Sequence, residues 1–272
     1  MVITVLGTAA AEGWPALWCV CDACREAAVL GGRNIRKRTA YNIDNRVQVD
    51  FGPDAYRQMA EHGLDYSQLE HLLITHSHAD HLQPTDLAYR RPGFAVIPEG
   101  SWLVAYGNVY AEARVREAIP DLSRCSMEWR PIEPFRPVDL GDGLVATPLP
   151  AEHAGGEEAV NYLLQQDGRG ALLGTDTGWW PPETWEYLSG CRLEVVLLDC
   201  TYGPSEYSGG HLNCASVVRA KAELQKLGAA ADGWRFIATH FSHNGGALHE
   251  ELEEILGPEG VEVAYDGMLI EV

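Results

Sequence analysis

The chain has 272 residues, of which 46% are hydrophobic, and this is enough apolar material for a sizeable buried core. Its formal net charge of −19 comes from 39 acidic and 20 basic side chains, and it disfavours a long nucleic acid or an anionic membrane surface as a partner. A small anionic substrate is compatible with this charge, because bound divalent metal ions reverse its sign locally.

The N-terminal run MVITVLG has no basic region and no small-residue cleavage site, so it predicts a first strand and not a signal peptide. No apolar run approaches the length needed to span a membrane. The seven cysteines are an odd number, and three of them are clustered, so the sequence favours a cytoplasmic protein with reduced thiols. A homodimer is compatible with the sequence, which does not indicate the oligomeric state.

Strand-like and helix-like segments then alternate along the chain and predict one α/β domain over residues 1–272, with mixed sheets covered by helices. The alternating run NRVQVDF ends at Asp50, and the short run HLLIT leads directly into His76. Later strands are predicted at GLVATPL, NYLLQQ, ALLGT, EVVLLD, RFIATH and VEVAY. Helices are predicted at 54–62, 111–118, 182–188, 215–227 and 247–256, and hairpin turns at 141–143 and 167–170.

Near the N-terminus, the segment WCVCDAC at residues 18–24 places three cysteines within six residues. Thiolates at such spacing are typical metal ligands, and a structural zinc site has about four of them. No fourth cysteine follows nearby, so the fourth ligand has to come from elsewhere in the chain. The remaining cysteines are scattered and are expected to be reduced, mostly buried thiols: Cys125, Cys191, Cys200 and Cys214.

The strongest motif is ITHSHADH at residues 74–81, where three histidines and one aspartate fall within six residues after a predicted strand. Imidazole and carboxylate are ligands that borderline divalent metals prefer. The spacing lets His76 and His78 face one metal ion, while Asp80 and His81 face another. Two-metal sites need more ligands than one loop supplies. Further candidates stand at the ends of later predicted strands: His153, Asp176 and His240.

This ordered set of motifs resembles the metallo-β-lactamase superfamily over nearly the whole chain. The resemblance implies an αβ/βα sandwich with the metals at one edge. It also implies the ligand sets, which are His76, His78 and His153 for one metal, Asp80, His81 and His240 for the second, and Asp176 as a bridge between them. Asp50, in VDFG at a strand end, resembles the aspartate of that superfamily that supports the metal ligands from behind.

His243 follows His240 by three residues, in HFSH, and lies just beyond the predicted catalytic site on the same loop. It is therefore the candidate for the fourth ligand of a structural zinc with Cys19, Cys21 and Cys24. Together with the opening LGTAAAEGWPALWCVCDAC, these motifs resemble phosphodiesterases of the PhnP type. That resemblance implies hydrolysis of 5-phosphoribosyl 1,2-cyclic phosphate.

Two further features bear on catalysis. His211, in SGGHLNCASVV, resembles the histidine beside the substrate phosphate in phosphodiesterase members, and we predict that it protonates the leaving oxygen. Asp80 or Asp176 is expected to help orient the attacking water. The dense basic run RNIRKR either binds a substrate phosphate or forms a solvated loop, which is the favoured interpretation, and its basic side chains are Arg33, Arg36, Lys37 and Arg38.

The sequence thus predicts a hydrolase with two active-site divalent ions, drawn from zinc, manganese, iron or nickel, and one structural zinc. Its expected substrate is a small, cyclic phosphodiester. A tRNA 3′-processing nuclease is disfavoured by the acidic charge and by the lack of a basic glycine-proline-rich arm. A lactone or thioester hydrolase is not rejected by the metal site alone. A non-catalytic carrier similar to the PQQ-biosynthesis B proteins is disfavoured by the complete ligand set.

Overall fold

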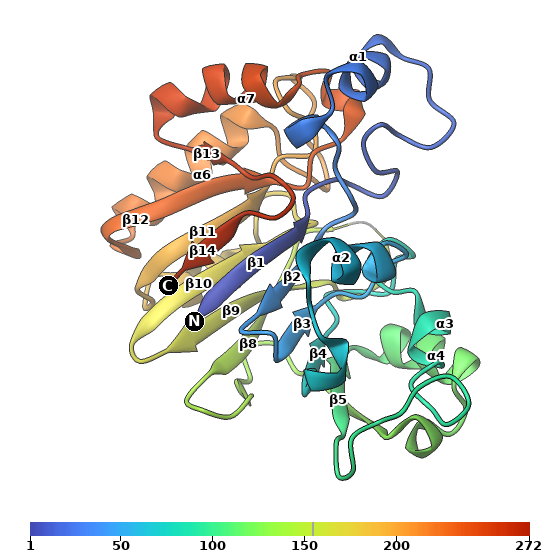
Figure 1. Ribbon diagram of the computed structural model, residues 1–272. Coiled ribbons are helices and arrows are strands. Elements are labelled where there is room, and N and C mark those ends of the chain that lie inside the picture. The colour runs from blue at the N-terminus through green and yellow to red at the C-terminus, as the bar shows by residue number, and fades with distance from the viewer. Residues whose placement is uncertain (154) are drawn as a thin grey trace.

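Two mixed β-sheets form the centre of the computed structural model, which describes residues 1–153 and 155–272 (Figure 1). The strand order in the first sheet is β14 (Leu269–Glu271), β1 (Val2–Gly7), β2 (Ala40–Ile43), β3 (Val47–Val49), β4 (His71–Leu73), β5 (Leu103–Gly107) and β6 (Met127–Pro131). In the second sheet it is β13 (Glu262–Val263), β12 (Ala230–Thr239), β11 (Leu193–Asp199), β10 (Arg169–Gly174), β9 (Val160–Gln166), β8 (Val145–Pro150) and β7 (Val138–Asp139).

Each sheet is antiparallel on one side and parallel on the other. In the first sheet the pairs from β14 to β3 are antiparallel and those from β3 to β6 are parallel. In the second sheet the pairs from β7 to β10 are antiparallel and those from β10 to β13 are parallel. Because parallel strands have their carboxyl ends at the same edge, the loops after β3 and β4, and those after β10, β11 and β12, open at one edge of each sheet.

Apolar side chains hold the two sheets face to face. Ile3, Val5 and Tyr41 of the first sheet share one fully buried cluster with Leu173 and Leu197 of the second. Helices cover the outer face of each sheet, as Figure 1 shows. The helices are α1 (Asp22–Leu30), α2 (Ala55–His62), α3 (Pro84–Leu87), α4 (Val109–Ala118), α5 (Pro182–Leu188), α6 (Cys214–Lys226) and α7 (His249–Leu256). The predicted αβ/βα sandwich is therefore confirmed.

Most of the predicted helices agree with the structure to within about two residues. The helix predicted at 54–62 is α2, and it ends at Gly63, where a φ of 62° lets the backbone N–H of Gly63 donate to Met59 O. The turn predicted at 167–170 joins β9 to β10, with positive φ at Asp167 and Gly168. Among the helices of the described residues, none is both long and apolar enough to cross a membrane.

Several elements were missed by sequence reasoning, and α1 is the most instructive. No helix is predicted from the sequence at the cysteine segment, but Cys21 stands at the N-cap of α1 and Cys24 lies within the helix. The helix buries only Cys24 and Ala27, so it has too few apolar positions for a clear helical period. The short strands β2, β5, β6, β7 and β14 and the four-residue helix α3 were also missed.

Gly52 gives a test of how closely the loop after β3 packs against the histidine-rich loop. A Cβ built on Gly52 would lie 1.9 Å from the backbone oxygen of Asp80, so Gly52→Ala has to displace backbone. We expect a loss of unfolding free energy of about 1–3 kcal/mol, as for other overpacked sites. Urea unfolding measures it. Gly257→Ala is the matched control, since its Cβ would meet nothing within 4 Å. Equal stability of the two variants would contradict this close packing.

Candidate metal centre

The donors predicted from the sequence meet at the edge where the strands end. The loop after β4 carries His76, His78, Asp80 and His81, and the loops after β8, β10 and β12 carry His153, Asp176 and His240. They form two groups that share Asp176: His76, His78 and His153 with Asp176, and Asp80, His81 and His240 with Asp176. Within each group the donor atoms lie within 4.8 Å of one another.

The buried carboxylate of Asp176 stands at the centre of this arrangement. Its Oδ2 lies 3.3 Å from Nε2 of His76 and 3.1 Å from Nε2 of His81. Nε2 of His153 is 3.5 Å from the same oxygen, and Oδ1 contacts Nε2 of His240. Asp176 and His240 have φ values of 52° and 60°, in the left-handed region that is unfavourable for non-glycine residues. The fold therefore holds these donors in place at some cost in backbone strain.

Asp50, predicted to support the ligands, lies directly behind His81. Its Oδ2 accepts a hydrogen bond from Nδ1 of His81 at 2.6 Å, so Nε2 of His81 is directed toward Asp176. Asp50 is fully buried and also accepts from the backbone N–H and the hydroxyl of Thr75. A carboxylate behind a histidine in this way determines the ring's tautomer and orientation.

Asp199, at the end of β11, supports the ring of His240 from behind, as Asp50 does for His81. Sequence reasoning did not identify it. Its Oδ2 lies 2.8 Å from Nδ1 of His211 and 3.4 Å from Nδ1 of His240. The hydroxyl of Thr201 donates to Asp199 and lies 2.9 Å from Nδ1 of His240. A signal did exist, since EVVLLD ends in an aspartate after a buried strand, as VQVD does at Asp50.

Glu157, also missed, joins two of the ligand-bearing loops. It accepts hydrogen bonds from the backbone N–H of Ser77 at 2.7 Å and from the Ser77 hydroxyl at 2.5 Å. Ser77 lies between His76 and His78, and Glu157 lies on the loop that carries His153. The side-chain amide of Asn108 donates to Glu157 as well. No local sequence pattern marks Glu157, because its partners are about 50 and 80 residues away in the chain.

The chemistry of this donor set fits metal ions. Nε2 of His76 and Nε2 of His81 are buried and lie 3.3 and 3.1 Å from Asp176 Oδ2, but within the described part of the chain neither forms a well-directed hydrogen bond. Such unsatisfied atoms cost about 1–3 kcal/mol each. Burial by itself lowers the pKa of His240, but the charge of Asp176 outweighs this effect and the pKa is raised to about 10. The same negative potential attracts a divalent cation, which would satisfy the unpaired nitrogens.

His211 stands over this centre, next to His240 and His153. Its ring is stacked on that of His240 with centroids 5.7 Å apart, and its ring centroid is 4.9 Å from that of His153. Burial by itself lowers the pKa of His211, but the hydrogen bond to Asp199 raises it, and the net direction is upward. His211 lines a cavity of about 300 Å³ together with Asp80 and Asp176, and Glu12 lies on its wall.

The basic run lies outside this cavity. Three of its basic side chains form ion pairs, and the fourth, Arg36, forms buried hydrogen bonds. Arg36 is buried and donates to Thr8 Oγ1 and to Ala264 O, so the predicted solvated loop is wrong for this residue. Arg33, Lys37 and Arg38 form ion pairs with Glu253, Glu61 and Asp54, respectively. Their charge is thus used within the fold, and none of the four is among the described residues that line the cavity.

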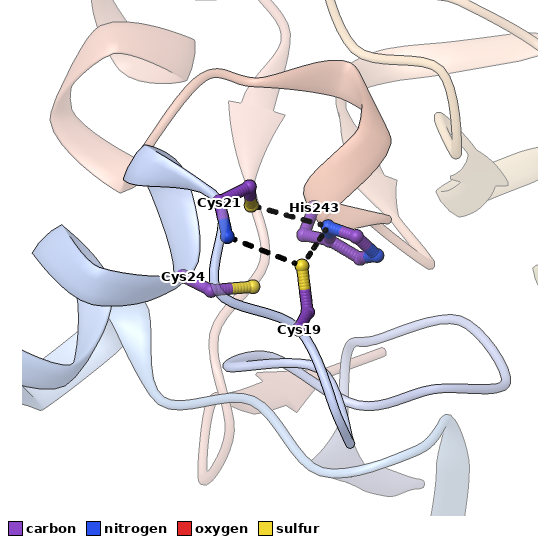
Figure 2. Close-up of side chains that lie close together, drawn as sticks. All are labelled: Cys19, Cys21, Cys24 and His243. Carbon is purple, nitrogen blue, oxygen red and sulfur yellow. Dashed lines mark hydrogen bonds between the residues drawn. The ribbon is translucent and has the colours of Figure 1, made fainter.

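A second donor group lies where the sequence placed it, with Cys19, Cys21, Cys24 and His243 pointing toward one another (Figure 2). Nδ1 of His243 lies 3.5 Å from the sulfurs of Cys19 and Cys21, and all four donor atoms are within 4.8 Å of one another. A backbone hydrogen bond at the start of α1, from the Cys24 N–H, lowers the pKa of Cys21 to about 6, whereas burial raises the pKa of Cys24 to about 12. Three sulfurs and one imidazole are the donor set of a closed metal site.

Comparison with known proteins agrees with this geometry. Residues 45–241 match the family described as the beta-lactamase superfamily domain, and this span contains Asp176 and all six donors around it. Cys19, Cys21, Cys24 and His243 lie outside the matched span. A search of curated proteins gives no significant match.

Three solved structures are similar to this chain, and each comparison covers nearly the full length of both chains. A diphosphatase from the PhnP family has 25% identity and a TM-score of 0.77, with 100% of this chain and 97% of that chain covered. Zn(2+)-bound PqqB from Methylobacterium extorquens has 17% identity and a TM-score of 0.79, with 100% of each chain covered. The short form of human tRNase Z has 16% identity and a TM-score of 0.68, with 100% and 99% covered.

The cysteine group can be tested with Cys21→Ser. Loss of one thiolate weakens the hold on a metal ion, and part of that binding energy is folding energy. We expect the variant to lose about one tightly held metal ion per chain by elemental analysis and to melt at a lower temperature. Cys191→Ser, a half-buried cysteine outside the group, is the control. Unchanged metal content and stability in Cys21→Ser would show that these cysteines are not ligands.

Proposed function

The chain belongs to the β-lactamase superfamily, and we propose that it is a metal-dependent phosphodiesterase that hydrolyses a small, cyclic phosphodiester such as 5-phosphoribosyl 1,2-cyclic phosphate. The observation that carries the proposal is that the two donor groups that share Asp176 and the imidazole of His211 meet at one cavity of about 300 Å³. Similarity to a PhnP-family diphosphatase supports phosphorus as the site of attack.

Asp176 and the six donors around it would hold two divalent ions, for which zinc, manganese, iron and nickel are all chemically suitable. Such ions supply positive charge to phosphate oxygens and make a bound water acidic enough to act near neutral pH. The cysteine group would hold a zinc ion with no open position, so its role would be structural. We place the enzyme in the cytoplasm, where such thiols stay reduced.

The chain's own residues supply the positioning and the proton transfer. Asp80, which lines the cavity, would accept a hydrogen bond from the attacking water and direct its lone pair toward phosphorus. His211 would protonate the leaving oxygen, on the side of the phosphorus opposite the attacking water. Asp199 supports this role, because it accepts from Nδ1 of His211 at 2.8 Å and so leaves Nε2 as the nitrogen available to the substrate.

The charge of the protein favours a small substrate over an RNA. Arg33, Lys37 and Arg38 of the basic run form ion pairs within the fold. The net charge of −19 repels a long nucleic acid. A carrier function is disfavoured by the complete donor set, whereas a lactone or thioester substrate is compatible with the same metals and has to be excluded by assay.

A diphosphate is the second candidate substrate, because the solved structure with 25% identity is that of a diphosphatase. The same site would serve both reactions. In each case water attacks phosphorus and His211 protonates the oxygen that leaves, which is a sugar oxygen in the cyclic ester and a phosphate oxygen in the diphosphate.

A substrate panel tests the proposed reaction. Purified metal-loaded enzyme is given a cyclic ribose phosphodiester, a nucleoside diphosphate, a lactone, a thioester and precursor tRNA, and product formation is followed for each. We expect the highest kcat/KM for the cyclic phosphodiester, with the diphosphate as the nearest competitor. A preference for the lactone, the thioester or precursor tRNA would refute the proposal, as would a lack of turnover with all five.

The role of His211 is tested by comparing leaving groups. General acid catalysis is worth about a hundredfold to ten-thousandfold for a poor leaving group such as a sugar alkoxide. We therefore expect His211→Ala to lose about this much kcat/KM on the cyclic ribose phosphodiester and far less on bis-p-nitrophenyl phosphate, whose phenolate leaves without a proton. Equal losses on both substrates would identify His211 as a phosphate-binding residue, and no loss on either would remove it from the mechanism.

A further inference from the structure

Glu12 is an acidic residue on the cavity wall that the proposed reaction does not use. It reaches the cavity from the segment after β1, and its side chain is about three-quarters buried, with 29% exposed. A carboxylate at this wall repels an anionic substrate, so the proposed reaction gives it no favourable contact with a phosphate. Its contacts with the protein point to a different role.

The backbone that carries Glu12 is joined to the loop that carries both His240 and His243. The N–H of Phe241 donates to Thr8 O, and the N–H of Ala10 donates back to Phe241 O. On its other side, the carbonyl of Glu12 accepts from the N–H of Leu17, in the turn that leads to Cys19. Glu12 therefore lies between the cysteine segment and the loop that carries His240 and His243.

The carboxylate of Glu12 reaches the far side of the His243 ring. Its Oε1 accepts from the hydroxyl of Ser242 at 2.5 Å and lies 3.5 Å from Nε2 of His243. Nδ1 of the same ring faces the sulfurs of Cys19 and Cys21, as Figure 2 shows. A histidine that binds a metal through Nδ1 carries its proton on Nε2, and a carboxylate acceptor there keeps the ring in that tautomer and orientation.

We propose that Glu12 is the positioning residue that holds His243 on the metal of the cysteine group and ties that metal to the wall of the catalytic cavity. The inference rests on a metal at the cysteine group, which is part of the proposed function, and it does not depend on the identity of the substrate. Loss of such an outer partner typically costs about 10–100-fold in metal affinity.

Cobalt substitution tests this inference without an activity assay. Co(II) bound by thiolates gives a sulfur-to-cobalt charge-transfer absorption that the histidine and aspartate donors around Asp176 do not produce. The rate at which this absorption disappears in excess chelator reports the release of the ion from the cysteine group. We expect release from Glu12→Ala to be about 10–100-fold faster than from the unaltered protein. Release from Glu12→Gln should be intermediate, because the amide oxygen is a weaker acceptor.

Two further variants make the result specific to His243. Asp22→Asn removes the same charge beside Cys21, but its side chain is fully exposed and lies 4.0 Å from Arg25, so release should be unchanged. In a double-mutant cycle, Glu12→Ala should add little to the effect of His243→Ala, because Glu12 acts through that ring. Additive effects, release from Asp22→Asn as fast as from Glu12→Ala, or no change in Glu12→Ala would overturn the proposal.

The outcome for Glu12 can be separated from that for the catalytic proposal. If the unaltered protein shows no thiolate absorption, the metal at the cysteine group and the role of Glu12 fall together, whereas the substrate panel can still succeed. If the absorption is present and the Glu12 variants behave as expected, the inference holds even when the panel identifies another substrate.

Discussion

The burial of the Asp176 carboxylate is the constraint on which the rest of the site depends. A buried, uncompensated charge is among the most costly features a fold can contain, so its surroundings have to supply positive charge. Four histidines contact Asp176, and two of them, His81 and His240, have carboxylates of their own behind them. The result is a layered arrangement, with acid at the centre, imidazole around it and acid again outside. Metal ions bound at the centre would supply charge that protons on the histidines otherwise provide.

The strand ends explain why these layers form at one place. Asp199 ends β11, Asp50 directly follows β3, and Asp176 lies two residues after β10. The sandwich brings the ends of these buried strands to a single edge. The central carboxylate, Asp176, and the two carboxylates behind the histidines, Asp50 and Asp199, are therefore all positioned by the ends of strands. The strands determine where these side chains lie, and the type of residue at each strand end determines whether it can bind a metal or support a ligand.

The sequence was informative where chemistry is dense and local, and less so where partners are distant. ITHSHADH and WCVCDAC could be identified as donor groups because several metal-binding side chains fall within a few residues. Asp199 had a strand-end signal that was not used, and Glu157 and Glu12 had none, since their roles depend on side chains far along the chain. The basic run at residues 33–38 shows the same limit. Its density suggested an anion site, but Arg36 packs beside residues more than 200 positions away, including His249 and Ala264.

The distance along the chain between Cys19 and His243 has a consequence for synthesis. The two residues are 224 positions apart, so the cysteine group gains its last donor only when the chain is nearly complete. At typical translation speeds of about 5–20 residues per second, roughly 10–45 s pass between the synthesis of the three cysteines and that of His243. During this interval the thiols are accessible to other metals and to oxidants, because His243 has not yet been added to the chain. A metal site at this group would therefore assemble correctly only if its thiols stayed reduced throughout translation.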